Sequence, residues 1–188
     1  ASLARNLPEA DRIGAALASE AGPPSYHRAM TTTRLDLPDE AATVRLAQAL
    51  AAVAVVGDVI ALSGDLGAGK TAFARAFVRA RAGDAALVVP SPTFTLVQVY
   101  DLPGGPIWHV DAYRLAAPDE AFELGLDEAF ATAVTLIEWP EHVAGIVPST
   151  ALRLALEDGP SPDARRLSID APEDWRRRLA SVLAGFDV

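Results

Sequence analysis

The chain has 188 residues, of which 51% are hydrophobic, so it can bury the core of one domain with some chain to spare at one end. Its formal net charge of −9 argues against a surface that coats nucleic acid, and the absence of cysteine excludes disulfides, thiolate zinc sites and cysteine nucleophiles. No apolar run approaches the roughly 20 residues of a membrane-spanning helix, so we expect a cytoplasmic protein with no membrane partner.

The first thirty residues are expected to lie outside the folded domain. Met30 is the only methionine, and it follows the stretch AGPPSYHRA, which is rich in residues that break helices and strands. We therefore divide the chain into an N-terminal extension, residues 1–30, which is either poorly ordered or not native, and a domain over residues 31–188.

The first elements of the domain form a helix, a strand and a second helix. Residues 37–54 carry apolar side chains at helical spacing, at Val44, Ala47, Leu50 and Val53 or Ala54. Residues 57–64 are a short apolar run bounded by glycines, which is typical of a buried strand. Residues 70–81 predict a helix with Phe73 and Phe77 on one face. A strand, a glycine-rich loop and a helix therefore follow one another.

The remaining chain predicts two hairpins, further helices and one more buried strand. In order, these are a hairpin of residues 91–102 and 107–115, helices over 118–131 broken at Gly125, a strand over 133–139, a hairpin of 152–157 and 165–170, and a helix over 172–186. On the closing helix, one face carries Trp175, Leu179 and Val182 or Leu183. Strands alternate with helices early and form hairpins later, so we expect an α/β fold with a mixed sheet.

The segment GDLGAGKT matches the phosphate-binding pattern G-x-x-x-x-G-K-[ST] and lies between the predicted strand and the predicted helix. Its residues are the predicted nucleotide contacts: Gly64, Asp65, Leu66, Gly67, Ala68, Gly69, Lys70 and Thr71. Small residues let backbone N–H groups turn toward phosphate oxygens, and the helix N-terminus adds positive dipole. A glycine-rich turn without a ligand would carry the same letters, but chance matches in this context are uncommon.

These signals predict a three-layer P-loop NTPase fold with a mixed, largely parallel central sheet and hairpin strands. Lys70 is the only lysine, and it would reach the β- and γ-phosphates as a compact ammonium where the planar fork of arginine would not fit. Thr71 would offer its hydroxyl to Mg²⁺. A guanine-reading N-K-x-D element is absent, because Lys70 is the only lysine and Asn6 the only asparagine, so ATP is favoured.

Two acids stand at the ends of predicted strands, Asp111 after PIWHV and Glu138 after AVTLI. Either could hold Mg²⁺ or orient the attacking water, and either alone could instead be a solvated acid. Thr93 in SPTFT could contact Mg²⁺ or the γ-phosphate as a switch loop does, or simply belong to a strand entry shaped by prolines. We expect His109 to be a core or hydrogen-bonded packing residue, and Arg114 to be solvated or to stabilise phosphate charge.

Five segments in this order closely resemble the TsaE (YjeE) family: GDLGAGKT, SPTFT, HVDAYRL, ELGLDE and IEW. The resemblance covers roughly residues 35–160. It implies a small bacterial P-loop ATPase, weak alone, that is needed to make threonylcarbamoyladenosine at position 37 of certain tRNAs. It also implies partners, namely the TsaB–TsaD complex, whose TsaD subunit transfers the threonylcarbamoyl group, while tRNA is met only indirectly.

The resemblance also implies roles for individual residues. Gly64 through Thr71 would hold the triphosphate, and Thr93 would lie in the switch-like S-P-T-F segment. Thr71 and Glu138 would belong to the Mg²⁺ site, and Asp111 would be the acid of the family's H-x-D-x-Y-R motif, a further candidate for the metal. We thus take Lys70, Asp111 and Glu138 as the catalytic candidates.

Two other functions remain open from the residues alone. A small-molecule or nucleoside kinase would use the same phosphate cradle but would transfer the phosphate to a metabolite. A nucleotide-gated interaction module would bind ATP and barely hydrolyse it. The leading hypothesis is an ATPase subunit of the tRNA-modification machinery.

Overall fold

The structure is a computed structural model, and it describes residues 32–115 and 118–186. The predicted N-terminal extension, residues 1–30, lies outside the described residues, so the predicted division of the chain stays a prediction.

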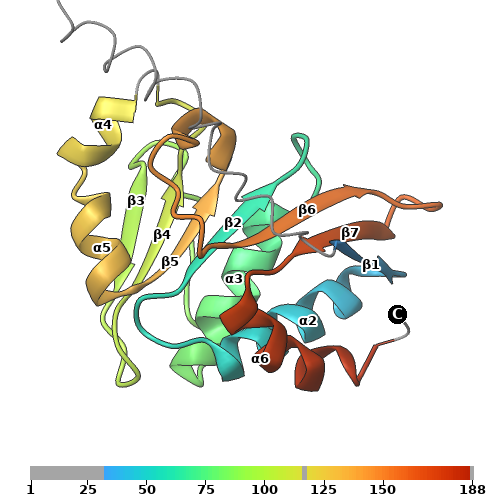
Figure 1. Cartoon of the computed structure of the whole chain (residues 1–188). Helices are drawn as coiled ribbons and strands as arrows, with labels where there is room; N and C mark the ends of the chain where they lie inside the picture. The colour runs from blue at the N-terminus through green and yellow to red at the C-terminus, as the bar shows by residue number, and fades with distance from the viewer. Residues whose placement is uncertain (1–31, 116–117, 187–188) are drawn as a thin grey trace, which may run out of the picture. The chain divides into compact units, whose positions relative to one another are not determined.

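One mixed sheet forms the centre of the domain (Figure 1). Within the described ranges it has seven strands, in the order β1-β7-β6-β2-β5-β4-β3. The strands are β1 (Thr32–Leu37), β2 (Val59–Ser63), β3 (Val97–Tyr100), β4 (Ile107–Asp111), β5 (Val134–Glu138), β6 (Leu152–Asp158) and β7 (Arg165–Asp170). The pairs around the centre, β2 with β5 and β6 and β4 with β5, are parallel, whereas β3–β4, β6–β7 and β1–β7 are antiparallel. The expected mixed sheet with hairpins at its sides is confirmed.

Helices cover the two faces of this sheet, which makes three layers (Figure 1). The helices are α2 (Glu40–Val53), α3 (Lys70–Ala82), α4 (Pro118–Glu123), α5 (Leu126–Thr132), the 3₁₀ helix η1 (Pro140–Val143) and α6 (Glu173–Leu183). The larger core cluster joins α2, α3 and α6 to one face, and the smaller joins α4, α5 and η1 to the other. Among the described residues, no helix is long and apolar enough to cross a membrane.

Strand β2 shows how the sequence builds two cores from one strand. Successive side chains of a strand point to opposite faces of its sheet. Ile60 and Leu62 accordingly pack in the larger cluster, while Val59 and Ala61 pack in the smaller one, and all four are buried. A continuous apolar run is therefore what a central strand covered on both faces requires.

The buried face of α2 differs in part from the predicted one. Asp39 caps the helix by accepting a hydrogen bond of 2.7 Å from the N–H of Ala42. Leu46 and Leu50 face the core, whereas Val44, predicted on that face, is only half-buried. The helix is rich in alanine on several sides, so its periodicity alone defines the buried stripe poorly.

Strand β1 was not predicted: residues 32–36 were assigned to no element, and Leu37 was placed at the start of the following helix. Leu35 and Leu37 alternate with polar residues and are buried, which is the pattern of a strand with one covered face. By contrast, the break between α4 and α5 falls at Gly125, which has a left-handed φ of 76°, as predicted.

The register of the sheet positions the site. Strands β2, β4 and β5 are parallel, so their carboxyl ends lie at one edge, and the P-loop follows β2 there. Asp111 and Glu138 are direct cross-strand partners at the ends of β4 and β5. The two predicted acids are thus neighbours at the edge from which the P-loop extends.

Candidate functional site

The glycines of the P-loop adopt backbone conformations that other residues avoid. Gly64, Gly67 and Gly69 have φ values of 138°, 86° and 106°. A Cβ at Gly64 would lie 2.3 Å from the carbonyl oxygen of Leu156, so only glycine fits between β2 and β6 there. A Cβ at Gly67 or Gly69 would meet nothing within 4 Å, and both residues line the cavity described below.

Lys70 opens α3 and lies almost wholly inside the loop, with 4% of its surface exposed. Its Nζ donates hydrogen bonds of 2.5 Å and 2.9 Å to the carbonyl oxygens of Gly64 and Asp65. The ammonium also lies 3.6 Å from the centre of the Trp139 ring, a cation–π contact. Burial lowers the pKa of Lys70, and nearby acids, Glu138 first among them, partly oppose that shift.

Glu138 joins the end of β5 to the start of α3. Only 2% of the residue is exposed. Its Oε2 accepts a hydrogen bond of 2.8 Å from the hydroxyl of Thr71, and its Oε1 lies 2.7 Å from Nε2 of His109. The threonine of the P-loop motif and the acid of the IEW segment are therefore brought together, 67 residues apart in the chain.

Asp111 is the centre of a second contact set, at the end of β4. Its Oδ2 accepts a hydrogen bond of 2.8 Å from the hydroxyl of Thr93, and its Oδ1 accepts one of 3.0 Å from the backbone N–H of Tyr113. The hydroxyl of Ser91 lies 2.9 Å from that of Thr93. The structure places the Thr93 hydroxyl on this acid, and a contact of Thr93 with Mg²⁺ or the γ-phosphate stays a prediction.

The segment around Thr93 is a turn rather than the first part of a strand. Residues 91–96 precede β3, which begins only at Val97. The N–H of Leu96 donates to the carbonyl oxygen of Pro92 at 2.6 Å, and Leu96 has a φ of 65°. Pro90, Pro92 and the left-handed Leu96 explain why this apparently β-favouring segment forms a loop at the site.

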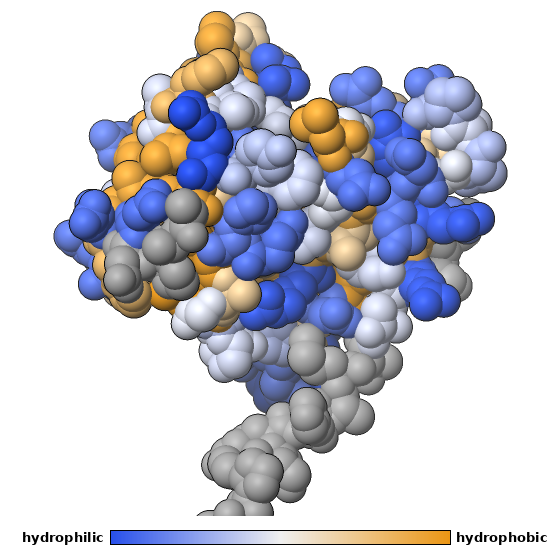
Figure 2. Space-filling view, turned by 90° about the horizontal axis from the view of Figure 1, so that it is seen from above, coloured by the Kyte–Doolittle hydropathy of each residue, from blue (hydrophilic) through white to orange (hydrophobic). Residues whose placement is uncertain are grey.

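A cavity of about 310 Å³ lies between these groups. It is lined by Leu66, Gly67, Gly69, Lys70, Thr71, Ala72, Ser91, Thr93, Asp111, Tyr113, Glu138 and Trp139. Large apolar side chains are exposed at or near its mouth, with exposed fractions of 92% for Leu66, 86% for Phe94 and 54% for Tyr113. Figure 2 looks onto this edge of the sheet, where hydrophobic groups stand out against a largely hydrophilic surface.

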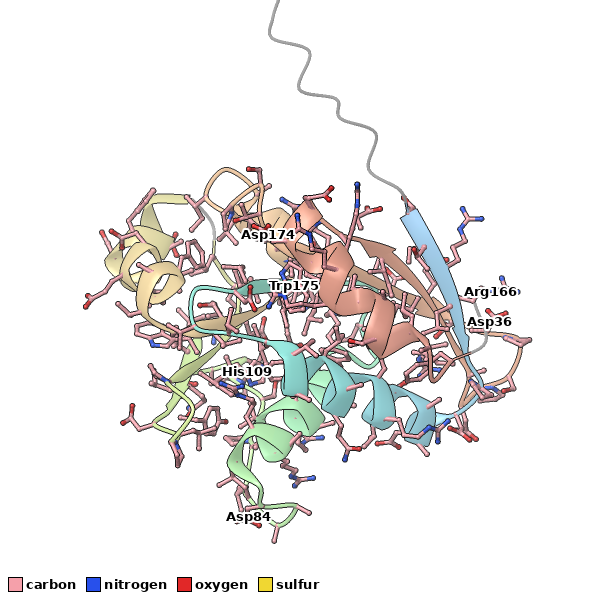
Figure 3. All side chains as sticks on the ribbon, turned by 60° about the horizontal axis from the view of Figure 1, so that its bottom comes forward. Asp36, Asp84, His109, Arg166, Asp174 and Trp175 are labelled. Carbon is pink, nitrogen blue, oxygen red and sulfur yellow. The ribbon has the colours of Figure 1, made fainter. Side chains whose placement is uncertain are left out.

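Two residues that contact the site elements were not among the predicted site residues. His109 was expected to be a core or hydrogen-bonded packing residue, and it is both: it lies in the interior (Figure 3), and its Nε2 contacts Glu138. Arg165 of β7 donates to the carbonyl oxygens of Ala68 and Gly67 at 2.9 Å and 3.3 Å. The H-x-D spacing on a strand, which puts both side chains on one face, could have pointed to His109. No local signal pointed to Arg165.

A family model described as "Threonylcarbamoyl adenosine biosynthesis protein TsaE" matches residues 37–167 of this chain. The chain belongs to the TsaE family. The resemblance predicted from the five segments is therefore confirmed, and the matched range contains the P-loop, the Thr93 turn and both acids.

Curated TsaE proteins and one solved structure are similar to most of this chain. The tRNA threonylcarbamoyladenosine biosynthesis protein TsaE of Rickettsia bellii is 38% identical over 128 residues, 68% of this chain and 88% of that protein. The protein of the same name from Bacillus subtilis is 36% identical over 151 residues, 80% of this chain and 91% of its own. The crystal structure of Bacillus subtilis YdiB superposes with a TM-score of 0.68 at 28% identity, covering 83% and 97% of the two chains.

The site of this TsaE-family chain fits a nucleotide with Mg²⁺ better than a metal ion alone. No group of three or more His, Cys, Asp or Glu side chains that could hold a metal occurs within residues 32–115 and 118–186. Mg²⁺ at nucleotide sites keeps several waters and takes one or two protein ligands besides the phosphates. The adjacent Thr71 hydroxyl and buried Glu138 carboxylate form such a small oxygen donor set beside the open P-loop.

Proposed function

We propose that this chain is an ATP-binding and ATP-hydrolysing subunit required for threonylcarbamoyladenosine modification at position 37 of tRNAs, acting in the cytoplasm with homologues of TsaB and TsaD. The observation that carries the proposal is the contact between Thr71 of the P-loop and Glu138 of β5, beside a loop open to phosphate. The names of the TsaE relatives supply the pathway.

The P-loop binds the triphosphate. Backbone N–H groups between Gly64 and Thr71 donate to the phosphate oxygens, apart from that of Ala68, which donates to the Asp65 carbonyl at 3.1 Å. Lys70 exchanges its contacts with the Gly64 and Asp65 carbonyls for the β- and γ-phosphates. The absence of an N-K-x-D element favours adenine over guanine.

Thr71 and Glu138 are the groups that would hold Mg²⁺, and that ion would neutralise charge on the β- and γ-phosphates. His109 keeps one carboxylate oxygen of Glu138 engaged, so the other stays directed at Thr71 and the phosphate site. The chain thus holds one carboxylate oxygen and one hydroxyl in a fixed geometry before nucleotide binds, so binding does not have to order these two groups.

Asp111 is the candidate for orienting the attacking water. Its hydrogen-bond partners are Thr93 of the switch-like turn and the N–H of Tyr113 rather than a residue of the P-loop, and it lines the same cavity as the P-loop. A carboxylate there accepts a hydrogen bond from water and directs the oxygen lone pair at phosphorus. The Thr93 contact makes the position of Asp111 depend on the conformation of the turn.

Slow hydrolysis by the chain alone and faster turnover with its partners fit the openness of the cavity. Leu66 and Phe94 expose apolar surface near the mouth, and coverage by a protein partner would exclude water and order the turn. The net charge of −9 supports contact with tRNA through the partners rather than directly.

Phosphate release tests the proposal. The chain is incubated with Mg·ATP, with and without purified TsaB–TsaD, together with the variants Lys70→Ala and Arg166→Ala. We expect release to rise with the partners, to be lost in Lys70→Ala, and to be unchanged in Arg166→Ala, whose side chain lies on β7 away from the cavity. ATP consumed with a phosphorylated metabolite and no free phosphate would instead identify a kinase.

A further inference from the structure

We propose that Arg165 is a positioning residue for nucleotide binding, which holds the tip of the P-loop in its phosphate-binding shape from outside the motif. The proposal rests on the proposed nucleotide binding but concerns a residue on strand β7, 97 positions along the chain from Ala68 at the loop tip. Its basis is a set of hydrogen bonds that all run from one guanidinium to backbone carbonyl oxygens.

The guanidinium of Arg165 bridges the P-loop and the β6–β7 hairpin. On the P-loop side, Nε donates to Ala68 at 2.9 Å and Nη2 donates to Gly67 at 3.3 Å. On the hairpin side, Nη1 donates to Pro162 at 2.8 Å and to Ala164 at 2.7 Å. Four of the five guanidinium N–H groups are thus used by these contacts. Only 19% of the side chain is exposed.

These contacts fix the direction of the amides that a phosphate needs. In a trans peptide the C=O of one residue and the N–H of the next point in opposite directions. When Arg165 holds the carbonyls of Gly67 and Ala68, the N–H groups of Ala68 and Gly69 must turn away from it, and that of Ala68 donates to the carbonyl of Asp65 at 3.1 Å. Arg165 therefore supports the turn that the Ala68 N–H closes and sets the orientation of the Gly69 N–H, a donor of the predicted phosphate cradle.

Lys70 and Arg165 divide the carbonyls of the loop between them. Lys70 holds Gly64 and Asp65, whereas Arg165 holds Gly67 and Ala68. When Lys70 turns to the phosphates, it gives up its hydrogen bonds to the carbonyls of Gly64 and Asp65. The hydrogen bonds from Arg165 do not involve Lys70, so they can remain in place. Arg165 is then the side chain that keeps the loop tip shaped while the ligand is bound.

The chemistry of the position favours arginine specifically. The planar fork reaches carbonyls of two separate segments at once, which the single nitrogen of lysine cannot do. The nearest acid, Asp158, lies 3.9 Å from Nη1 of Arg165, and its side chain is 89% exposed. Because exposed ion pairs contribute little, this pair explains little of the position of the Arg165 guanidinium. The hairpin loop is itself ordered by a bond from the N–H of Gly159 to the carbonyl of Ala164 at 3.0 Å.

The test compares the full-length chain with Arg165→Gln, Arg165→Lys and the control Arg166→Gln. Arg166 is the next residue on β7, is largely exposed, and extends outward beside Asp36 of β1 (Figure 3). Affinities for ADP and Mg·ATP are measured by calorimetry. Hydrogen exchange is measured on residues 64–71 and on the β6–β7 strands, first without nucleotide and then, in the unaltered chain, with saturating ADP.

We expect Arg165→Gln and Arg165→Lys to bind nucleotide at least tenfold more weakly, and Arg166→Gln to bind within twofold of the unaltered chain. Without nucleotide, amides of residues 64–71 should exchange faster in both Arg165 variants, while the strands keep their protection. Normal affinity in Arg165→Gln, or weak affinity with unaltered exchange of the loop, would overturn the positioning role. The second result would instead indicate a direct ligand contact.

If Arg165→Gln and Arg165→Lys both fail to fold, a measurement on the unaltered chain still tests the positioning role. Because Arg165 links the loop to the hairpin, ADP should slow exchange at Gly159 and Ala164 as well as in the P-loop. Protection confined to the P-loop would overturn the link. An unaltered chain that binds no nucleotide would contradict the proposed function instead, so the two failures are distinguishable.

Discussion

Replacement of Glu138 by glutamine separates the metal role of this acid from its structural role. The shape of the side chain is kept, and its carbonyl can still accept from His109 while its amide donates to Thr71. Each contact loses its charge assistance, about 1–1.5 kcal/mol, so we expect an unfolding free energy lower by about 2–3 kcal/mol. For a domain of this size that corresponds to a melting temperature lower by roughly 4–12 °C.

The expected effect on Mg²⁺ is larger than the effect on stability. A protein group that holds or orients a metal typically contributes about 10–100-fold to metal affinity. In phosphate-release assays with TsaB–TsaD, the Mg²⁺ concentration for half-maximal rate should rise by about that factor in Glu138→Gln. Asp111→Asn should lower the maximal rate and leave the half-maximal Mg²⁺ concentration unchanged. A normal Mg²⁺ dependence in folded Glu138→Gln would refute the assignment of Glu138 to the metal side.

Three further outcomes are expected. Burial lowers the pKa of Lys70 from its ordinary 10.5, so its ammonium loses its proton at a lower pH than that of a free lysine. As the pH is raised, the calorimetric affinity for ADP should therefore begin to fall before the pH reaches 10.5, and this fall should be absent in Lys70→Met. Gly64→Ala places a Cβ against the Leu156 carbonyl at 2.3 Å, so both melting temperature and ADP affinity should fall. Arg178→Met leaves Asp58 largely buried without its bidentate partner, which should cost about 2–3 kcal/mol in denaturant unfolding, with phosphate release per folded molecule unchanged.

Local signals predicted the elements of the fold well where the hydrophobic spacing, the positions of glycines and the P-loop motif agree. The strand, glycine loop and helix around Lys70, the two hairpins and the break at Gly125 were all expected and are present. The closing helix buries Trp175, Leu179 and Val182 as its spacing indicated. These features depend on residues close in sequence, which is why sequence alone could predict them.

The features that were wrong or missed depend on tertiary contacts. The buried stripe of α2 is decided by which side meets the sheet, and alanine on several sides gives little local preference. Strand β1 exists because β7 pairs with it, with Leu35 opposite Leu167. The segment at Thr93 has β-favouring residues, but its prolines and the contact with Asp111 form a turn.

The candidate site was predicted as a set of residues but not as a set of contacts. The pairing of Thr71 with Glu138 follows from the parallel register that aligns β2, β4 and β5, which no local pattern specifies. The reach of Arg165 to the P-loop depends likewise on the β6–β7 hairpin lying beside it. Side-chain chemistry could be read from the sequence, while partners required the fold.

Reconstituted tRNA modification tests the central claim most directly. Unmodified tRNA, a threonylcarbamoyl donor, ATP and TsaB–TsaD are combined with this chain or with its Lys70→Ala variant, and threonylcarbamoyladenosine is measured in digested tRNA by mass spectrometry. We predict repeated turnover with the unaltered chain and at most a single round with Lys70→Ala or without the chain. Equal yields of the modified nucleoside in all three reactions would contradict an ATP-dependent role of this site.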